Sequence, residues 1–419
     1  MMERIEARYW IETPFPVEKA ASAMAGEQSS GTFVKVVGES EELTRRHAAR
    51  VERIEQLESV AAPSLPVSGA LGFVPAEYQR AFVTLSWPIE NVGYHLQNVM
   101  ATVAGNLFEL SQFTGLRLLE LGLPEAFYKK YVGPRHGVSG TRKLVSVSQR
   151  PMIGTIIKPS VGLSPKQTGK RVAELVEAGV DFIKDDELMG DPPHSPFEER
   201  VDAVMTVINE LAQIQGRKAM YAFNVSGSID EMLKRHDYVV SRGGTCVMAS
   251  MNWVGMSGIE TLATHSDVPI HGHRNGWGMF YRSPFMGVNY TVMQKIWRML
   301  GVDHLHCNGL RNKFCESDES VVASAKACLD PLSGYGDRAL PVISSGQWAG
   351  QASDTFESIG SPDLLYVCGG GIVGHPDGLK AGVNSVRSAW EAALQGVPLG
   401  EAMSASTDLQ RAVEFFAKP

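Results

Sequence analysis

From residue 131 onward, apolar and polar positions repeat one pattern about every 30 to 40 residues. Each repeat has a short apolar run, a polar loop and a segment with apolar residues at helical spacing, which predicts a strand followed by an amphipathic helix. The predicted strands are Met152–Lys158, Phe182–Asp186, Ala219–Val225, Thr245–Ser250, Ile270–Arg274, His304–Cys307, Pro341–Ser344 and Leu364–Cys368. Predicted helices include Lys166–Ala178, Phe197–Gln215, Ile229–Ser241 and Leu379–Leu394. Eight such units predict a (β/α)8 TIM barrel. A doubly wound sheet is the alternative, but no GxGxxG opens a helix after the first strand.

The first 130 residues lack this repeat and alternate shorter elements. Strands are predicted at Ile5–Thr13, Thr32–Val37 and Phe82–Pro88, and helices at Val17–Ala25 and Val92–Leu107. The charge-rich segment 39–58 is predicted to be a solvated helix. We therefore expect a compact α+β (ferredoxin-like) domain over residues 1–130 and a barrel domain over residues 131–419.

The stretch Asp181–Glu187 has the most informative chemistry, because a lysine stands among carboxylates at the end of a predicted strand. Side chains alternate along a strand, so Lys184 and Asp186 are expected on one side and Asp185 on the other, with Glu187 turning back. Such a group is either a salt-bridge cluster or, if the lysine has captured CO2 as a carbamate, a set of oxygen ligands for Mg²⁺. The stretch alone favours the ion pairs, whereas the rest of the chain favours the metal.

A barrel places its catalytic groups at the C-terminal ends of the strands, and the predicted strand ends of this chain are polar. They carry Lys158, Lys184 with Asp186 and Glu187, Asn224, His273 with Arg274, His306, Ser344 and Gly369–Gly371. Basic, acidic and glycine groups on nearly all eight strands are expected to converge on one pocket. We interpret Gly369–Gly371 and Ser344–Gly346 as backbone that holds a phosphate, with tight-turn glycine as the alternative for either run alone.

Composition narrows the function classes. A chain of 419 residues is long enough for two domains, and a net charge of −7 with a pI near 5.9 argues against nucleic acid as a partner. The five cysteines show no metal-binding spacing and suit a reducing compartment. No apolar run of about 18 residues and no signal peptide is recognisable, so a cytoplasmic protein without a membrane partner is expected.

Taken together, these motifs resemble the large subunit of RuBisCO. The matching segments run in order through almost the whole chain: Glu27–Thr32, Gly105–Phe108, Gly154–Pro159, Gly162–Ser164, Asp181–Glu187, His273–Arg274, Asp303–His306 and Gly369–His375. The chain is identified as a member of this superfamily by that ordered set.

The resemblance implies a role for each matching residue. Lys184 would be carbamylated and would bind Mg²⁺ together with Asp186 and Glu187, while Lys158 would move protons at the enediolate carbon. His273 would contact a substrate hydroxyl. The implied ligands of the substrate ends are Arg274, His306 and Ser344 on one side, and Gly346, Gly369 and Gly370 around a phosphate on the other. The implied residues that reach the barrel mouth of a partner subunit are Glu27, Thr32 and Asn106, so a homodimer or higher homo-oligomer is expected.

Departures from the family pattern argue against a carboxylase. Ser160 stands where the carbon-fixing enzymes have a second lysine, and Trp277 stands where they have a histidine. We therefore expect a RuBisCO-like protein that shares the metal and enolate chemistry but uses another substrate. Lys313, seven residues after His306, either faces a carboxylate of that substrate or is a solvent-exposed loop lysine.

The expected activity is a Mg²⁺-dependent decarboxylase, a lyase that acts on a phosphorylated β-keto sugar acid through an enediolate. Among RuBisCO-like proteins, the known activity of this kind is decarboxylation of 3-oxo-isoapionate 4-phosphate in apionate catabolism. A methionine-salvage enolase or isomerase is the alternative, and Trp277 and Met256 would then offer a thiomethyl group an apolar wall. A non-catalytic binding protein on the same scaffold is a third hypothesis, against which the intact metal triad counts.

Overall fold

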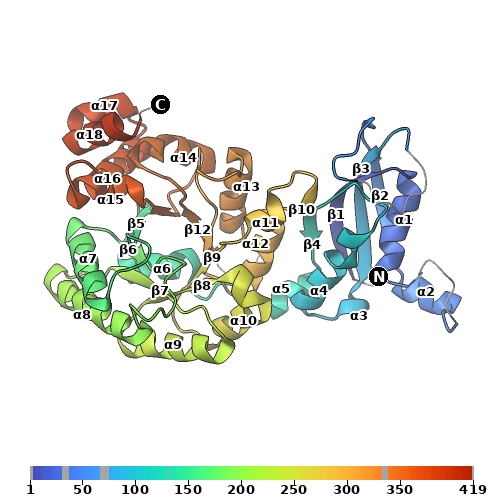
Figure 1. Ribbon diagram of the computed structural model, residues 1–419, viewed down its shortest axis with the longest axis horizontal. Helices are drawn as coiled ribbons and strands as arrows, with labels where there is room; N and C mark the ends of the chain where they lie inside the picture. Colours follow the sequence, from blue (N-terminus) through green and yellow to red (C-terminus); the bar gives the residue numbers. More distant parts are fainter. Residues whose placement is uncertain (1–2, 31–36, 67–74, 132, 333–337, 418–419) are drawn as a thin grey trace. The chain divides into compact units, whose positions relative to one another are not determined.

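The computed structural model describes residues 3–30, 37–66, 75–131, 133–332 and 338–417, and the chain forms two compact units (Figure 1). The first unit comprises Met1–Tyr131 together with Trp277–Ile296. The second comprises Val132–Gly276 and Trp297–Pro419. Residues 277–296 therefore belong with the N-terminal part of the chain. The two predicted domains were contiguous and did not include this return of the chain to the first unit.

The first unit is built on a mixed five-stranded sheet in the order β10-β4-β1-β3-β2. The strands are β1 (Arg4–Thr13), β2 (Arg50–Gln56), β3 (Gln79–Pro88), β4 (Gly115–Gly122) and β10 (Met286–Val288). Alternate residues of β1, including Ile5, Tyr9 and Ile11, are buried, as expected for a strand with one face on a core. Helix α1 (Val17–Glu27) packs against β2 and β3. The α+β fold expected for this part of the chain is confirmed.

Two sequence predictions in this unit are corrected. Segment 39–58 is not one helix, because α2 (Glu41–His47) is followed by the strand β2. This strand is an edge of the sheet, and charged residues are common on edges because they discourage pairing with another chain. The predicted helix Val92–Leu107 is three pieces: α3 (Ile89–Val92), α4 (Leu96–Val103) and the 3₁₀ turn η2 (Asn106–Glu109). Gly93, with φ of 61°, ends the first piece in a conformation that favours glycine. Of the predicted strand Thr32–Val37, residues 32–36 lie outside the described residues.

The second unit confirms the predicted barrel. Its eight parallel strands close in the order β11-β12-β13-β5-β6-β7-β8-β9. They are β5 (Met152–Ile156), β6 (Phe182–Lys184), β7 (Met220–Asn224), β8 (Cys246–Ser250), β9 (Ile270–His273), β11 (His304–His306), β12 (Leu340–Ile343) and β13 (Leu365–Val367). Each observed strand overlaps the run predicted for it, because strands buried on both faces form continuous apolar segments.

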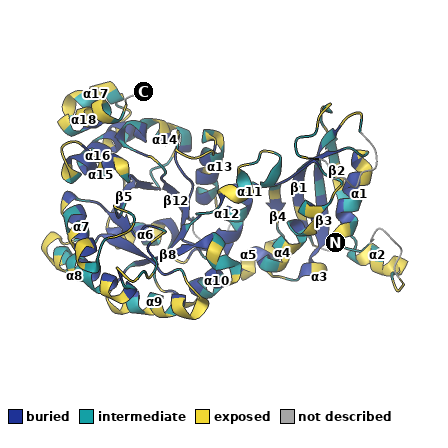
Figure 2. Ribbon diagram, in the orientation of Figure 1, coloured by how far each residue is buried: buried dark blue, intermediate teal, exposed yellow. Residues whose placement is uncertain are grey.

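Helices surround the barrel, with exposed outer faces over buried strands (Figure 2). The main ones are α7 (Pro165–Ala178), α8 (Phe197–Gln215), α9 (Ile229–Ser241), α10 (Met251–His265), α13 (Asp318–Leu329), α14 (Ala352–Ile359) and α16 (Leu379–Gln395). The remaining elements are α5 (Glu125–Lys130), α11 (Gly278–Tyr281), α12 (Tyr290–Met299), η3 (Ala349–Gln351), α15 (Gly370–Val373), α17 (Leu399–Ala405) and α18 (Thr407–Phe416). Over the described residues, none of these helices is both long enough and apolar enough to cross a membrane.

One short helix, α6 (Gly137–Val145), closes the N-terminal end of the barrel. Val138 and Val145 of this helix share a buried cluster with first residues of strands, among them Met152 and Phe182. The opposite end, where the strands give way to loops, is the end at which barrels carry their functional groups.

Candidate active site

Lys184, the last residue of β6, lies at the centre of the candidate site. Its side chain is 1% exposed, and its Nζ donates to the Asp185 carbonyl (2.8 Å) and lies 3.5 Å from Oε2 of Glu187. The Asp185 carboxylate points elsewhere and accepts from the Tyr221 hydroxyl (2.6 Å) and the Asn224 N–H (3.0 Å). The strand alternation therefore separates a structural carboxylate from the group around Lys184.

Asp186 joins this group to the loop that follows β5. Lys158 Nζ donates to Oδ2 of Asp186 (2.8 Å) and to Oγ of Ser160 (2.5 Å). Burial alone would raise the pKa of Asp186, but the hydrogen bonds from Lys158 and Ser160 and the charge of Lys184 hold this pKa below its usual value. Ser160 thus helps to hold the Lys158 ammonium beside Asp186.

His273, at the end of β9, lies on the Glu187 side. Its Nε2 is 3.4 Å from Oε2 of Glu187, and its Nδ1 is 3.1 Å from Oδ1 of Asn275. Burial, followed by the charge of Lys184, lowers the pKa of His273 to about 4, so the ring is neutral at neutral pH. A neutral imidazole can donate a hydrogen bond to a ligand hydroxyl, or accept one from it, without adding a charge to the site.

The donors around Lys184 fit a hard divalent cation. Burial lowers the pKa of the Lys184 ammonium, against the opposing effect of Glu187, Asp186 and Asp185. A lower pKa makes the neutral amine, which reacts with CO2, easier to form. The carbamate would add an oxygen ligand to those of Asp186 and Glu187, and oxygen ligands are what Mg²⁺ prefers.

Across the barrel mouth, hydrogen bonds between uncharged side chains join β11 and the loops after β11 and β12. Ser344 Oγ is 3.2 Å from Nδ1 of His306, and Ser345 Oγ donates to Oδ1 of Asn308 (2.7 Å). Ser345 and Asn308 have φ of 71° and 60°, a left-handed conformation that costs free energy for residues other than glycine. Gly346, with φ of 95°, continues the same turn.

Arg274 is held in position by a charged partner. It forms a buried ion pair with Glu316, whose Oε2 also accepts from Nδ2 of Asn308 (2.7 Å) and whose Oε1 accepts from Ser320 Oγ (2.7 Å). Glu316 and Asn308 were not predicted from the sequence, because both lie in the irregular loop between β11 and α13, where no periodicity marks a buried residue.

Three other predicted residues lie on the loops of this face. Gly369 precedes the short helix α15 and Gly370 is its first residue, so their N–H groups have no partner within that helix. Lys313 is exposed, and its backbone N–H donates to the carbonyl of Ser345 (3.2 Å), which places it beside the Ser344–Gly346 loop.

The residues predicted to reach a partner subunit belong to the first unit. Glu27 is the exposed last residue of α1, and Asn106 is the exposed first residue of η2. Gln28 brings them close, since its amide, oriented to satisfy its neighbours, accepts from the Asn106 N–H (3.2 Å) and donates to the Ala101 carbonyl (3.2 Å). Thr32 lies outside the described residues.

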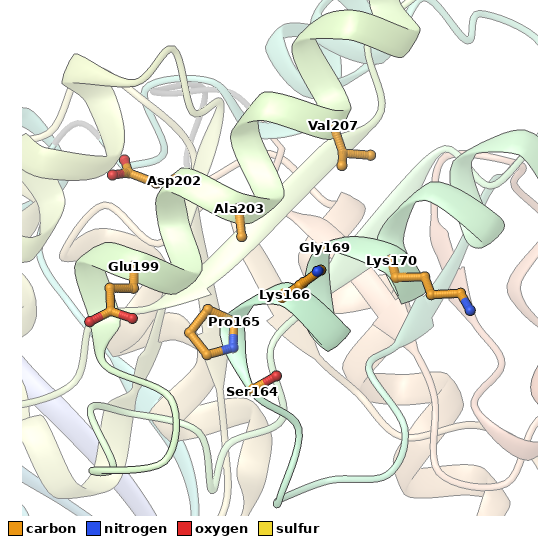
Figure 3. A pocket seen from close by; sticks show the side chains of 9 residues that line it. All are labelled: Ser164, Pro165, Lys166, Gly169, Lys170, Glu199, Asp202, Ala203 and Val207. Atoms are coloured by element: carbon orange, nitrogen blue, oxygen red, sulfur yellow. The ribbon is translucent and has the colours of Figure 1, made fainter.

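Two further features lie apart from the strand ends. A surface groove of about 540 Å³ runs between α7 and α8 (Figure 3), and none of the candidate site residues lines it. One compact group of His236, Asp237 and His265 is found among the described residues with metal-ligand spacing, on α9 and α10. Its hydrogen bonds join His265 Nε2 and His236 Nδ1 to the same Asp237 oxygen at 2.5 and 3.0 Å.

The chain thus combines an α+β unit with a (β/α)8 barrel in which one strand ends in a buried lysine next to a carboxylate. Comparison with known proteins gives the family. Residues 7–127 match the N-terminal domain of the ribulose bisphosphate carboxylase large chain, and residues 137–416 match its catalytic domain. The chain belongs to the RuBisCO large-chain family.

Close relatives of this chain are RuBisCO-like proteins. It is 50% identical over 99% of its length, and the whole of the relative, to a 3-oxo-isoapionate-4-phosphate transcarboxylase/hydrolase of Xanthobacter autotrophicus. It is 46% identical, over 94% of both chains, to a 3-oxo-isoapionate-4-phosphate decarboxylase of Rhizobium etli. A solved rubisco-like protein from Burkholderia fungorum is 47% identical and superposes with a TM-score of 0.93, over 99% of this chain and 100% of that one.

Proposed function

We propose that this chain is a Mg²⁺-dependent enzyme that removes the carboxyl group of 3-oxo-isoapionate 4-phosphate as CO2, through an enediolate. The observation that carries the proposal is the contact of Lys158 with Asp186 beside the buried Lys184, together with relatives whose names share one substrate. Metal and proton donor are then adjacent, as the chemistry requires.

The proposed metal ligands are the carbamate of Lys184 and the carboxylates of Asp186 and Glu187. When bound there, Mg²⁺ would stabilise the negative charge that develops on two neighbouring substrate oxygens. His273, 3.4 Å from Glu187, is placed to contact a substrate hydroxyl beside these ligands. Cleavage of the carbon–carbon bond leaves its electron pair on the substrate while CO2 departs.

Lys158 is the proposed proton donor to the carbon that loses CO2. Its ammonium is held by Asp186 and Ser160, and it is partly exposed toward the barrel mouth. A positioned acid of this kind contributes about 10²- to 10⁴-fold to a proton transfer.

The two substrate ends would be held by different loops. We assign the phosphate to the backbone of Gly346, Gly369 and Gly370, which presents N–H groups without side chains in the way. Arg274 and Ser344 would hold the other end, with His306 positioning Ser344 through the 3.2 Å contact of its Nδ1 with Oγ, and Lys313 would face the substrate carboxylate. By resemblance, Glu27, Thr32 and Asn106 of a second copy would complete the site in a homodimer.

A second candidate is transfer of the carboxyl group followed by hydrolysis, as named for the relative with 50% identity. The two candidates share the substrate and the first bond broken, and they differ in where the carboxyl carbon ends. By contrast, Trp277 packs against Phe280 and Tyr290, with ring centroids 5.7 and 5.2 Å away, so it adds no support for a thiomethyl substrate.

The deciding experiment uses 3-oxo-isoapionate 4-phosphate with ¹³C in its carboxyl group, followed by NMR in the presence of Mg²⁺ and bicarbonate. The label should appear as CO2 and bicarbonate. Label in the carboxyl group of an organic product would establish the transfer reaction instead. No turnover of this substrate, with turnover of a thiomethyl ketose phosphate, would overturn both candidates.

A further inference from the structure

A continuous line of hydrogen-bonding side chains crosses the inside of the barrel, from its closed end to the candidate site. Thr141 of α6 is 2.8 Å from Nε2 of His304, and Nδ1 of His304 is 3.4 Å from Nδ1 of His271. Nε2 of His271 is 2.8 Å from Nε2 of His306, and Nδ1 of His306 is 3.2 Å from Oγ of Ser344. All five residues are buried.

The three rings of this line are neutral. Burial lowers the pKa of each imidazole, to about 3 for His304 and well below the usual value for His271 and His306. Each neutral ring has one N–H and one bare nitrogen, so a donor at one side forces an acceptor at the other. The state of one end of the line therefore determines the state of the other.

The hydrogen bonds at the closed end of the barrel determine which nitrogen of each ring donates. Thr141 has a single hydroxyl proton, and its 2.6 Å contact with the Gly137 carbonyl uses that proton, because a carbonyl can only accept. His304 must then donate from Nε2, His271 from Nδ1 and His306 from Nε2. Nδ1 of His306 is left bare, and it accepts the proton of Ser344.

At the other end of the line, a contact between Ser344 and Ser345 favours the reversed arrangement of ring protons, but only weakly. If Ser344 donated to Ser345 instead, every ring would have to reverse. That contact is 3.4 Å long, as is the His304–His271 contact that both directions share, whereas the contact of Thr141 with Gly137 is 2.6 Å. The shorter contact is the stronger one, so the direction set by Thr141 prevails.

We propose that Thr141 is a positioning residue that acts through His304, His271 and His306 to make Ser344 a hydrogen-bond acceptor toward the substrate. Since Ser344 donates its only proton to His306, its hydroxyl oxygen can only accept from the substrate, which selects a substrate hydroxyl and disfavours an oxyanion or a ketone oxygen at this place. The inference rests on the proposed function for the identity of the substrate, but the direction of the line does not depend on it.

Histidine-ring NMR tests the direction in the substrate-free enzyme. The protein has eleven histidines, so ¹⁵N labelling of histidine alone gives a simple spectrum, and the three rings are assigned by single substitution. His271 should carry its proton on Nδ1, and His304 and His306 on Nε2. A proton on Nε2 of His271 would overturn the proposal, whether or not the proposed substrate is turned over.

Kinetics tests the effect on Ser344. Thr141→Val, which keeps the shape but removes the acceptor, should switch the three rings together and lower kcat/KM about tenfold, the effect of about one hydrogen bond. Thr141→Ser should keep wild-type spectra and rates. In a Ser344→Ala background, Thr141→Val should cause no further loss, because its effect passes through that hydroxyl. An equal further loss there, or unchanged rings in Thr141→Val, would show that Thr141 only packs the barrel end.

Discussion

The two sides of the candidate site are built in different ways. On the side of β5 and β6, charged groups at two neighbouring strand ends compensate one another, as in the contacts of Lys158 with Asp186 and of Lys184 with Glu187. On the side of β11 and β12, the buried ion pair of Arg274 with Glu316 is held by a loop that also contains left-handed turns and hydrogen bonds between uncharged side chains, such as Ser345 with Asn308. The charged cluster requires the right residues at the strand ends, whereas the second side requires a particular loop path. We therefore expect substitutions in the charged cluster to affect chemistry, and substitutions within the loops of the second side to affect shape and stability.

The largest effect is expected for Lys184→Met. Methionine cannot form a carbamate, so the site would lose one of its three proposed metal ligands. Mg²⁺ binding should therefore be lost, and turnover should fall by a factor on the order of 10³ or more. Calorimetric titration with Mg²⁺ and a rate assay with and without bicarbonate preincubation measure this. Because an apolar side chain replaces a buried ammonium, the thermal unfolding midpoint should not fall. Wild-type turnover in this variant, or in EDTA, would contradict the proposed metal site.

Lys158→Met should follow, with a loss of about 10²- to 10⁴-fold in turnover to the protonated product. The metal ligands remain, so Mg²⁺ affinity should change little. In D2O, the wild-type product should carry one deuterium at the carbon that bore the carboxyl group, as measured by NMR. Unchanged turnover in the variant would mean that another group delivers the proton.

On the side of β11 and β12, Glu316→Gln should lower stability. The Arg274 guanidinium would lose its charged partner while remaining buried, a loss that costs about 3 kcal/mol of unfolding free energy. Urea unfolding measures this cost. The matched control is Glu319→Gln on the exposed start of α13, where little change is expected. Equal losses of unfolding free energy at the two positions would show that the buried ion pair contributes no more to stability than an exposed carboxylate.

The smallest expected effect concerns the turn at Ser345. Ser345→Ala loses the hydrogen bond to Asn308 and keeps the left-handed strain, so it should lower stability by about 1 kcal/mol. Ser345→Gly loses the same bond but removes the strain, so it should remain close to wild type. Thermal unfolding of the pair measures the difference. A glycine variant less stable than the alanine variant would argue against strain in this turn.

The same contrast explains what the sequence could predict. All eight barrel strands and helices such as α8 and α9 follow from periodicity, and the group around Lys184 was visible because its members are adjacent in sequence. Glu316 and the strand β10 were not visible: the first is buried by a loop path, and the second has three residues and no pattern of its own.

The direction of the hydrogen bonds through His304, His271 and His306 also could not be predicted from the sequence. His304 and His306 were recognisable at a strand, but nothing in their spacing links them to His271 or to Thr141 of α6. Only the closed barrel brings the four together, because β9 and β11 are neighbours across a gap of thirty residues, 274–303, in the chain.

The placement of residues 277–296 has a consequence for synthesis of the chain. The sheet of the first unit receives β10 from residues 286–288, although its neighbour β4 ends at residue 122. The ribosome makes the 163 residues between them at about 5 to 20 per second, a delay of roughly 8 to 33 s. During this interval the edge of β4 has no partner strand, and an unpaired edge is a template for association with other chains. Nascent chains are thus most in need of chaperone protection in the interval after β4 has left the ribosome and before β10 has left it.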